Sequence, residues 1–161
     1  MNTSQTHIEI ASENSYIVYF GDPDSLQISP EVSAVIAATC EQIKQRFSVR
    51  LIDLVASYAS VLVIYDTHLC DHLWAKNALR SILNTPEKHS ENRGQLVKIP
   101  VFYSTKYGPE LALLAENAGL SIAQVIDIHS ATEYRVYAIG FAPGFAYLGE
   151  VDERLAAPRL A

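Results

Sequence analysis

The sequence predicts an α+β protein built from two structural parts. Three observations carry this prediction: short β-rich runs alternate with amphipathic helical stretches, a polar interruption divides the chain, and helix signals and apolar runs resume after it. The chain has 161 residues, of which 49% are hydrophobic. This length is typical of one domain or two small ones, and the apolar fraction is sufficient for a packed core.

The composition excludes several classes of protein. Only 19% of the residues are charged, so a disordered chain is not expected. The net charge of -6, from 12 basic and 18 acidic side chains, argues against a dedicated nucleic-acid binder. No apolar run is long enough to cross a bilayer, the start Met1–His7 is polar, and two cysteines are too few for a disulfide scaffold. We therefore expect a soluble, cytoplasmic protein without nucleic-acid or membrane partners.

The first half begins with a predicted hairpin and a helix. His7–Ala11 and Tyr16–Phe20 are short β-rich runs separated by turn-like residues. A helix follows, because Ser29 can cap it and Pro30 suits its first position. Its apolar residues recur at helical spacing and make one face: Val32, Val35, Ile36, Cys40, Ile43 and Phe47.

Two further strands and a second helix complete this half. Val49–Ala56 and Val61–Tyr65 are predicted strands. His72–Leu83 is a predicted helix whose apolar side we expect to contain Leu73, Leu79, Ile82 and Leu83. The order strand, helix, strand, strand, helix is most of a ferredoxin-like unit. Residues 1–85 are therefore predicted to form a ferredoxin-like α/β domain, and residues 86–94, which lack an apolar period, a linker.

Four elements are predicted in the second half: the strand Leu96–Tyr103, the helix Pro109–Asn117, the helix Ser121–Ile128 and the strand Glu133–Ile139. Pro100 limits the first strand to an edge or a bulge. Gly119 is expected to end the first helix. Ser121 and Gln124 have the spacing of a capping box, which opens the second helix.

The most unusual stretch is 138–149, AIGFAPGFAYLG, which carries no charge. Pro143 and Gly144 suit the two central positions of a type II turn. Phe141, Phe145 and Tyr147 alternate around this turn with small residues. Such a stretch suits a pocket wall or a partner surface, because its backbone can approach a ligand closely. A turn buried in the core of a barrel is the alternative interpretation.

Charged and titratable residues flank this stretch. Arg135 and Arg159 could each hold a carboxylate or phosphate through bidentate hydrogen bonds, or form ordinary surface salt bridges. His129 ends the predicted Ser121 helix, where the helix dipole would stabilise a protonated imidazole. Acid–base chemistry is the other interpretation of this histidine.

A second cluster, at positions 68–72, contains potential metal ligands in the run HLCDH. Its spacing matches no established zinc pattern, and Asp71 as a helix cap explains the same residues, so we predict no metal site. The sequence contains no P-loop, no nucleophile elbow, no H-E-x-x-H and no Rossmann fingerprint. The residues by themselves therefore indicate a ligand or partner surface and no named reaction.

A specific resemblance lies in the run His129–Pro158. It contains H-x-x-x-E-Y-x-V at His129–Val136 and GF-x-PGFAYLG at Gly140–Gly149, and it ends at the first residue of the pair Pro158-Arg159. With these motifs, the second half resembles the KipI family, also called allophanate hydrolase subunit 1 or the B subunit of 5-oxoprolinase (PxpB). The first half fits this family more loosely, through its order of elements and through SVLVIYD at Ser60–Asp66.

The resemblance implies that residues 95–161 form the N-terminal part of a cyclophilin-like, carboxyltransferase-type β-barrel domain. Relatives continue past the Pro158-Arg159 pair into further strands, so we expect the barrel to be truncated at Ala161. Open barrel edges would then permit self-association. One departure lies at 102–111, where relatives tend to have CYGGEYGPDL and this chain has FYSTKYGPEL, with Glu110 in place of aspartate.

The resemblance also implies a function. The chain would be the B subunit of an ATP-dependent 5-oxoprolinase that opens 5-oxo-L-proline to L-glutamate, and it would be inactive alone. Its partners would be a C-type subunit, similar to allophanate hydrolase subunit 2, and an A-type subunit of the LamB/YcsF kind. ATP would bind to the complex, and this chain would hold no metal. The alternatives are a KipI-like inhibitor of a sensor histidine kinase, or half of a biotin-dependent urea or allophanate carboxyltransferase, with biotin supplied by a partner.

The 5-oxoprolinase function implies roles for particular residues. His129 would transfer a proton, and Arg135 and Arg159 would hold the negative charge of a phosphorylated intermediate. The substrate or partner surface would be formed by the residues of the charge-free stretch, namely Gly140, Phe141, Pro143, Gly144, Phe145 and Tyr147.

Overall fold

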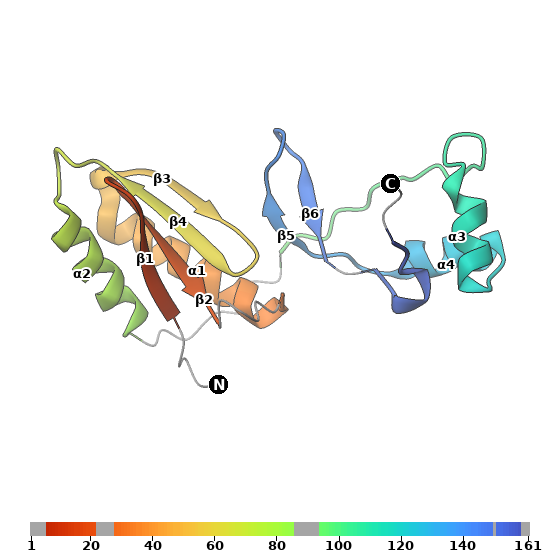
Figure 1. The fold of residues 1–161 in the computed structure, drawn as a ribbon, viewed down its shortest axis with the longest axis horizontal. Helices are drawn as coiled ribbons and strands as arrows, with labels where there is room; N and C mark the ends of the chain where they lie inside the picture. Colours follow the sequence, from red (N-terminus) through yellow and green to blue (C-terminus); the bar gives the residue numbers. More distant parts are fainter. Residues whose placement is uncertain (1–5, 22–27, 86–93, 150, 159–161) are drawn as a thin grey trace. The chain divides into compact units, whose positions relative to one another are not determined.

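The computed structural model describes residues 6–21, 28–85, 94–149 and 151–158. The chain divides into two compact units, the first comprising Met1–Arg93 with Tyr137–Phe145 and the second Gly94–Val136 with Ala146–Ala161. Figure 1 labels the helices and strands of both units. The mixture of helices and strands confirms the α+β class. The predicted linker lies almost wholly outside the described residues, so this division of the sequence stays a prediction.

The sheet of the first unit has four antiparallel strands in the order β1-β2-β4-β3. These strands are β1 (Thr6–Ser12), β2 (Ser15–Phe20), β3 (Leu51–Ala56) and β4 (Ser60–Tyr65). The predicted hairpin of β1 and β2 is confirmed, and so are the two later strands. β3 begins two residues later than expected, because a short 3-10 helix, η1 (Ser48–Arg50), follows the first α-helix directly. The ferredoxin-like assignment of this domain stays a prediction.

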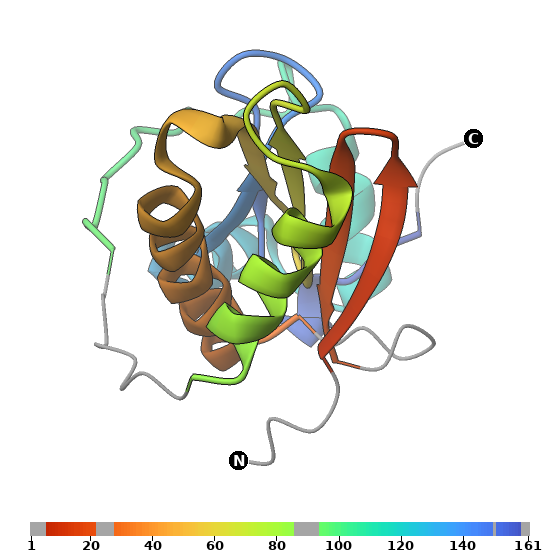
Figure 2. The ribbon, with the colours of Figure 1, turned by 90° about the vertical axis from the view of Figure 1, so that its left-hand side faces the viewer.

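Two helices, α1 (Pro30–Phe47) and α2 (His72–Leu83), cover one face of this sheet (Figure 2). The Ser29 hydroxyl accepts a hydrogen bond from the Val32 N–H at 3.2 Å, and Pro30 is the first helical residue. The Asp71 carboxylate caps α2 in the same way, accepting from the Trp74 N–H at 2.6 Å. Both predicted helix starts are therefore confirmed, each with one backbone N–H satisfied by a capping side chain.

The core of the first unit lies between the helices and the sheet. Its buried members are Tyr16, Val18, Phe20, Ile36, Cys40, Ile43, Phe47, Val61, Val63, Tyr65, Ala75, Ala78 and Leu79. The predicted apolar face of α1 is confirmed. On α2 the prediction for Leu73 is wrong, since this side chain is 67% exposed. The buried face of α2 runs through Ala75, Ala78 and Leu79, and a residue two positions before Ala75 points to the opposite side of a helix.

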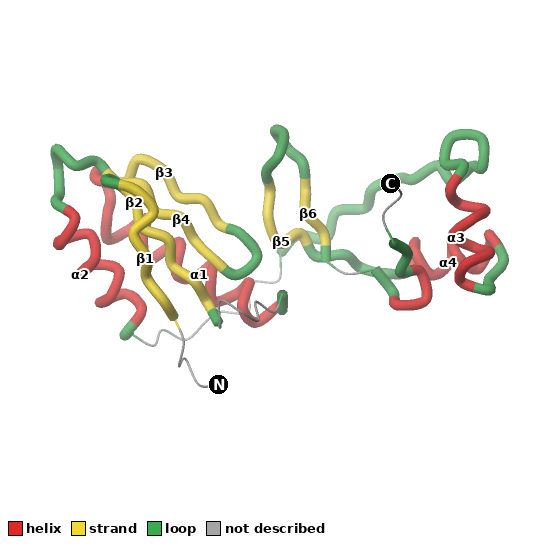
Figure 3. The backbone as a smooth tube through the Cα atoms, viewed as in Figure 1, coloured by secondary structure: helices red, strands yellow, loops and turns green. Residues whose placement is uncertain are grey.

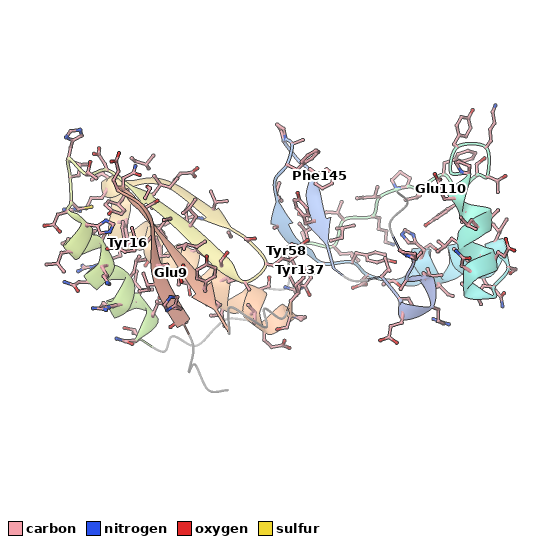
Figure 4. All side chains as sticks on the ribbon, viewed as in Figure 1. Glu9, Tyr16, Tyr58, Glu110, Tyr137 and Phe145 are labelled. Carbon is pink, nitrogen blue, oxygen red and sulfur yellow. The ribbon has the colours of Figure 1, made fainter. Side chains whose placement is uncertain are left out.

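The tyrosine hydroxyls of this core are satisfied by α2. Tyr16 donates to the His72 carbonyl at 3.1 Å, and its ring stacks on the His72 imidazole with centroids 4.2 Å apart (Figure 4). The Tyr65 hydroxyl forms a short hydrogen bond with His72 Nδ1. Burial raises the pKa of Tyr65 to about 12. His72 therefore connects the start of α2 to the sheet, and its ring is part of the core.

The second unit contains α3 (Glu110–Ala118), α4 (Ile122–Ala131) and the 3-10 helix η2 (Glu153–Leu155). Gly119 ends α3 with a φ of +64°, and the Leu120 N–H donates back to the Ala115 carbonyl at 2.9 Å. The capping box of Ser121 and Gln124 is present at the start of α4. Both predictions are confirmed. A small core of Ala115, Val125 and Leu155 joins the three helices.

The predicted strand Leu96–Tyr103 is wrong. Residues 94–103 have no regular secondary structure and are drawn as a loop in Figure 3. Within the described chain no segment pairs with them, and a β-strand exists only through hydrogen bonds to a neighbour. The apolar side chains that suggested a strand are exposed: Leu96, Val97, Ile99, Val101 and Phe102.

The charge-free stretch forms a hairpin. Its strands are β5 (Val136–Ile139) and β6 (Ala146–Leu148), which make a two-stranded sheet. β5 begins three residues later than predicted. This is the only sheet of the second half among the described residues, and the cyclophilin-like barrel stays a prediction. No single described helix is long and apolar enough to cross a membrane, and α3 and α4 meet that standard only as a pair bent by 92°.

Candidate functional site

His129 lies between two tyrosine rings in the second unit. It occupies the last turn of α4. The Tyr103 hydroxyl lies 2.6 Å from His129 Nδ1, and the Tyr103 ring meets the imidazole nearly edge-on, at 79°. On the other side the Tyr134 ring lies with its centroid 5.2 Å from that of the imidazole. The half-buried imidazole is thus oriented by contacts from the 94–103 segment and from the connection that follows α4.

This geometry leaves one ring nitrogen of His129 available. Nδ1 is engaged by Tyr103, whereas Nε2 makes no hydrogen bond to any residue that the structure describes. A hydrogen bond to one imidazole nitrogen fixes the orientation of the ring and defines the role of the other nitrogen. His129 can therefore present Nε2 to a reacting group as a proton donor or acceptor. Its position in the last turn is also compatible with the alternative role at the helix dipole.

Tyr134 adds an unsatisfied polar atom beside His129. Its hydroxyl is buried and, alone among the buried side-chain oxygens and nitrogens of the described residues, has no hydrogen-bond partner. A buried hydroxyl without a partner is costly, so a ligand atom or a water molecule would be bound favourably there. Neither tyrosine was predicted as a site residue. The sequence could have indicated Tyr134 as a site residue, because it lies within the motif His129–Val136. Nothing in the sequence links Tyr103 to His129.

The tip of the β5–β6 hairpin has an unusual backbone. The Ala142 N–H donates to the Gly140 carbonyl at 2.6 Å, which forces Phe141 to a φ of +60°. Positive φ is rare for a bulky residue, and such three-residue turns are strained. The predicted Pro143-Gly144 turn follows directly: Gly144 has a φ of +77°, and the Phe145 N–H donates to the Ala142 carbonyl at 3.0 Å. This prediction is confirmed.

The aromatic side chains of the tip are exposed. Phe141 is 90% exposed and Phe145 47%, and their rings meet edge to face with centroids 5.4 Å apart (Figure 4). In the described structure this turn is exposed, and its alternative interpretation as a turn buried in the core of a barrel stays a prediction, as the barrel does. Strained backbone and an exposed apolar ring together are typical of a surface that contacts something else. Tyr147, on β6, is half-buried.

The two predicted arginines have different outcomes. Arg135 directly precedes β5, and its carbonyl accepts a hydrogen bond from the Gly149 N–H at 2.8 Å, which closes the base of the hairpin. Its guanidinium forms no ion pair with a described residue, so it is available for an anion. The structure records no contact between the side chains of Arg135 and His129. Arg159 lies outside the described residues.

Asp152 and Arg154, which follow the hairpin, bind each other. The guanidinium donates to both carboxylate oxygens, at 2.8 and 2.7 Å, and the Asp152 carboxylate also caps η2 through the Arg154 N–H at 3.0 Å. These hydrogen bonds lower the pKa of Asp152 to about 2. The carboxylate thus has two local partners, the Arg154 guanidinium and the Arg154 backbone N–H that it caps in η2.

The HLCDH cluster has structural roles. Asp71 caps α2, and His72 is bonded to Tyr65 in the core. The Cys70 thiol approaches the Asp66 carbonyl at 3.7 Å, and burial raises the pKa of this thiol. Within the part of the chain that the structure describes, no three His, Cys, Asp or Glu side chains are grouped as metal ligands would be.

Glu110, the departure from the family pattern, opens α3 (Figure 4). Its carboxylate is in the first turn, where negative charge interacts favourably with the helix dipole. Either acidic residue would serve this purpose, so the change from aspartate to glutamate keeps the local stabilisation.

Comparison with known proteins defines the class to which the chain belongs. The family described as carboxyltransferase domain, subdomain C and D, matches residues 6–161. The chain therefore belongs to this family. A solved structure, that of the protein TTHA0988, has the same fold with a TM-score of 0.69 and 29% identity, covering 91% of this chain and 26% of that chain.

Individual relatives narrow the class further, to one kind of subunit. The B subunit of 5-oxoprolinase from Bacillus subtilis (strain 168) is 31% identical over 168 residues, which include 98% of this chain and 68% of the relative. The corresponding B subunit from Escherichia coli O157:H7 is 46% identical over 71 residues, 44% of this chain and 33% of the relative. The resemblance seen in the motifs is thus confirmed: this chain is a member of the family that contains KipI and the B subunits of 5-oxoprolinase. It spans about two thirds of the Bacillus relative and about a quarter of TTHA0988.

Proposed function

We propose that this chain acts in the cytoplasm as the B subunit of an ATP-dependent 5-oxoprolinase, which opens 5-oxo-L-proline to L-glutamate. The observation that carries the proposal is the 31% identity to the Bacillus protein of that name, which extends over 98% of this chain. The partners would be an A-type subunit of the LamB/YcsF kind and a C-type subunit similar to allophanate hydrolase subunit 2. The relatives' name, which designates one component of several, itself supports an assembly of different chains.

The reaction requires both proton transfer and stabilisation of negative charge. Opening the lactam breaks its C–N bond, and one water supplies the hydroxyl of the new carboxyl group and a proton for the amine. A second water is consumed as ATP, a substrate of the complex, is hydrolysed to ADP and phosphate. A phosphorylated intermediate would need cations close to its oxygens. Arg135, whose guanidinium has no ion pair in the described structure, and Arg159 are the candidates for this role.

His129 is the candidate for proton transfer. Tyr103 holds Nδ1, and Nε2 is open to a substrate or to a water molecule. The unsatisfied Tyr134 hydroxyl would accept or donate a hydrogen bond to the same ligand. The hairpin tip, with Phe141 exposed, would contact another protein of the complex or the substrate through Gly140, Phe141, Pro143, Gly144, Phe145 and Tyr147.

The first test is reconstitution of the full complex, with each component omitted in turn and glutamate and ADP measured. Glutamate formation that stops when this protein is left out supports the proposal. Replacing His129 by Gln should lower turnover about a hundredfold to ten-thousandfold, the usual contribution of a general acid or base. Replacing Tyr103 by Phe should lower turnover about tenfold, because one hydrogen bond to the imidazole is lost.

Tyr107→Phe is the matched control, since Tyr107 follows Tyr103 by four positions and is 72% exposed. It should leave turnover unchanged. Full activity of His129→Gln in an assembled complex would remove His129 from the mechanism. No glutamate from a complete, folded mixture would overturn the oxoprolinase function itself.

A second candidate function has one observation in its favour, namely that the matching family is described as a carboxyltransferase domain. The chain would then be half of a urea or allophanate carboxyltransferase, with biotin carried by a partner. Transfer of a carboxyl group from carboxybiotin to urea by the same reconstituted mixture, without glutamate formation, would favour this alternative.

At the level of fold, we propose a ferredoxin-like arrangement for the first domain and a cyclophilin-like barrel for the second. The order of elements in the first unit and the family membership support these assignments. Self-association through open barrel edges is part of the same proposal and would be measured as a concentration-dependent mass in solution.

A further inference from the structure

A cationic groove lies in the first unit. It is formed where β1 runs beside α2 and has a volume of about 390 Å³. Lys76 and Arg80 line it from α2, and Ile8 and Leu83 provide apolar wall on either side. None of the described residues that line the groove is acidic. The groove therefore combines positive charge with apolar surface in a chain whose net charge is -6.

The two cations of the groove have no counter-charge among the described residues. Lys76 and Arg80 are four residues apart, so they lie on the same face of α2. Neither makes an ion pair or a hydrogen bond with another described residue, whereas Lys44 is bonded to Glu41 at 2.7 Å and Arg154 to Asp152 at 2.7 Å. The third basic group of the groove, His7, is bonded to the Glu9 carboxylate at 2.9 Å. The Lys76 ammonium and the Arg80 guanidinium are thus available, within the described structure, to bind an anion.

Stability of the helix does not account for this pair. Like charges at positions i and i+4 destabilise a helix slightly. Arg80 is in the last turn of α2, where a cation interacts favourably with the helix dipole. Lys76 is in the middle of the helix, where this interaction is absent. An anion bound between the two side chains would relieve their repulsion.

We propose that this groove binds the phosphate group of a small anionic ligand. A carboxylate offers two oxygens, and the Arg80 guanidinium alone could satisfy both. The groove adds the Lys76 ammonium, the Thr6 hydroxyl and the Asn84 side-chain amide, so its donors and its charge match a phosphate dianion better. Ile8 and Leu83 would contact the remainder of the ligand.

This site is independent of the proposed oxoprolinase function, because none of its residues belongs to the His129 group or to the hairpin. It is tested by calorimetric titration of the full chain with inorganic phosphate, with pyrophosphate and with the dicarboxylate succinate. Phosphate or pyrophosphate should bind, more weakly as salt rises, and succinate should bind at least tenfold more weakly. Lys76→Gln and Arg80→Gln should each lower the affinity about tenfold or more, since each removes a charge-assisted hydrogen bond.

Lys44→Gln is the matched control, because it removes the same charge from an exposed position on α1. It should change the affinity less than twofold, and circular dichroism should show all three variants folded. Failure of both phosphates to bind the unaltered chain would overturn the proposal. So would an equal loss in Lys44→Gln, or succinate binding as tightly as phosphate.

Discussion

Asp152 shows how one carboxylate can make a local structure sensitive to acid. The pKa of Asp152 falls from an ordinary 3.8 to about 2, because the Arg154 guanidinium donates to both carboxylate oxygens and the Arg154 backbone N–H donates to one of them. A lowered folded-state pKa means that this contribution to stability is complete above about pH 4 and disappears as the pH falls through about 2.

We therefore expect the thermal unfolding temperature of the second unit to decrease as the pH is lowered from about 4 to about 2. The decrease should be smaller in Asp152→Asn. The amide can still accept from the Arg154 N–H but has no charge to lose. Thermal unfolding followed by circular dichroism at a series of pH values measures both proteins. Identical acid sensitivity in Asp152→Asn would show that other carboxylates cause it.

At the residue scale, sequence reasoning succeeded where a residue's role depends on its neighbours in the chain. Pro143 and Gly144 define their turn, and Asp71 caps its helix, through residues within three positions. The partners of His129 were missed, because Tyr103 reaches it from a segment 26 residues away and no periodicity encodes that contact. Leu73 was misplaced, because an apolar side chain near the start of a helix does not reveal which face is buried.

The same distinction holds for whole elements. Helix starts and stops were predictable, since caps and positive-φ glycines act within one turn. The segment Leu96–Tyr103 has the composition of a strand, yet a strand needs a partner, and the partner cannot be read from the segment's own residues. The late start of β5 has the same origin, because pairing decides where a strand begins.

Gly119 provides a test at this scale. It ends α3 with a φ of +64°, and a Cβ added there would meet nothing within 4 Å. Gly119→Ala should therefore lower the free energy of unfolding by about 1 to 2 kcal/mol through backbone strain alone, without a steric clash.

Gly94→Ala is the matched control, since it too has open space for an added methyl group but no positive φ. It should be neutral or slightly stabilising, by less than about 1 kcal/mol. Urea denaturation of the three proteins measures the difference. Equal effects of the two substitutions would contradict the role of the left-handed conformation at Gly119.

At the scale of the whole molecule, stability is concentrated in the first unit. Among the described residues, thirteen buried side chains form its core, whereas three form the core of the second unit. Phe47 is fully buried, and it contacts both the Tyr65 ring and the Trp74 ring. Phe102, in contrast, is 78% exposed.

Phe47→Ala should therefore lower the free energy of unfolding of the first unit by about 3 to 5 kcal/mol, through lost burial and an internal cavity. Phe102→Ala should change it by less than about 0.5 kcal/mol. Chemical denaturation followed by Trp74 fluorescence reports on this unit directly. A large effect of Phe102→Ala would show that its ring is covered in solution.

The strand order β1-β2-β4-β3 also has a kinetic consequence. Each of the two hairpins joins neighbours in sequence, and such hairpins form within microseconds. The central pairing of β2 with β4 joins residues such as Tyr19 and Ser60, with α1 and β3 between them in the chain. Closing that long loop costs entropy before its contacts are gained, so we expect the pairing of β2 with β4, rather than either hairpin, to limit the rate at which the first unit folds.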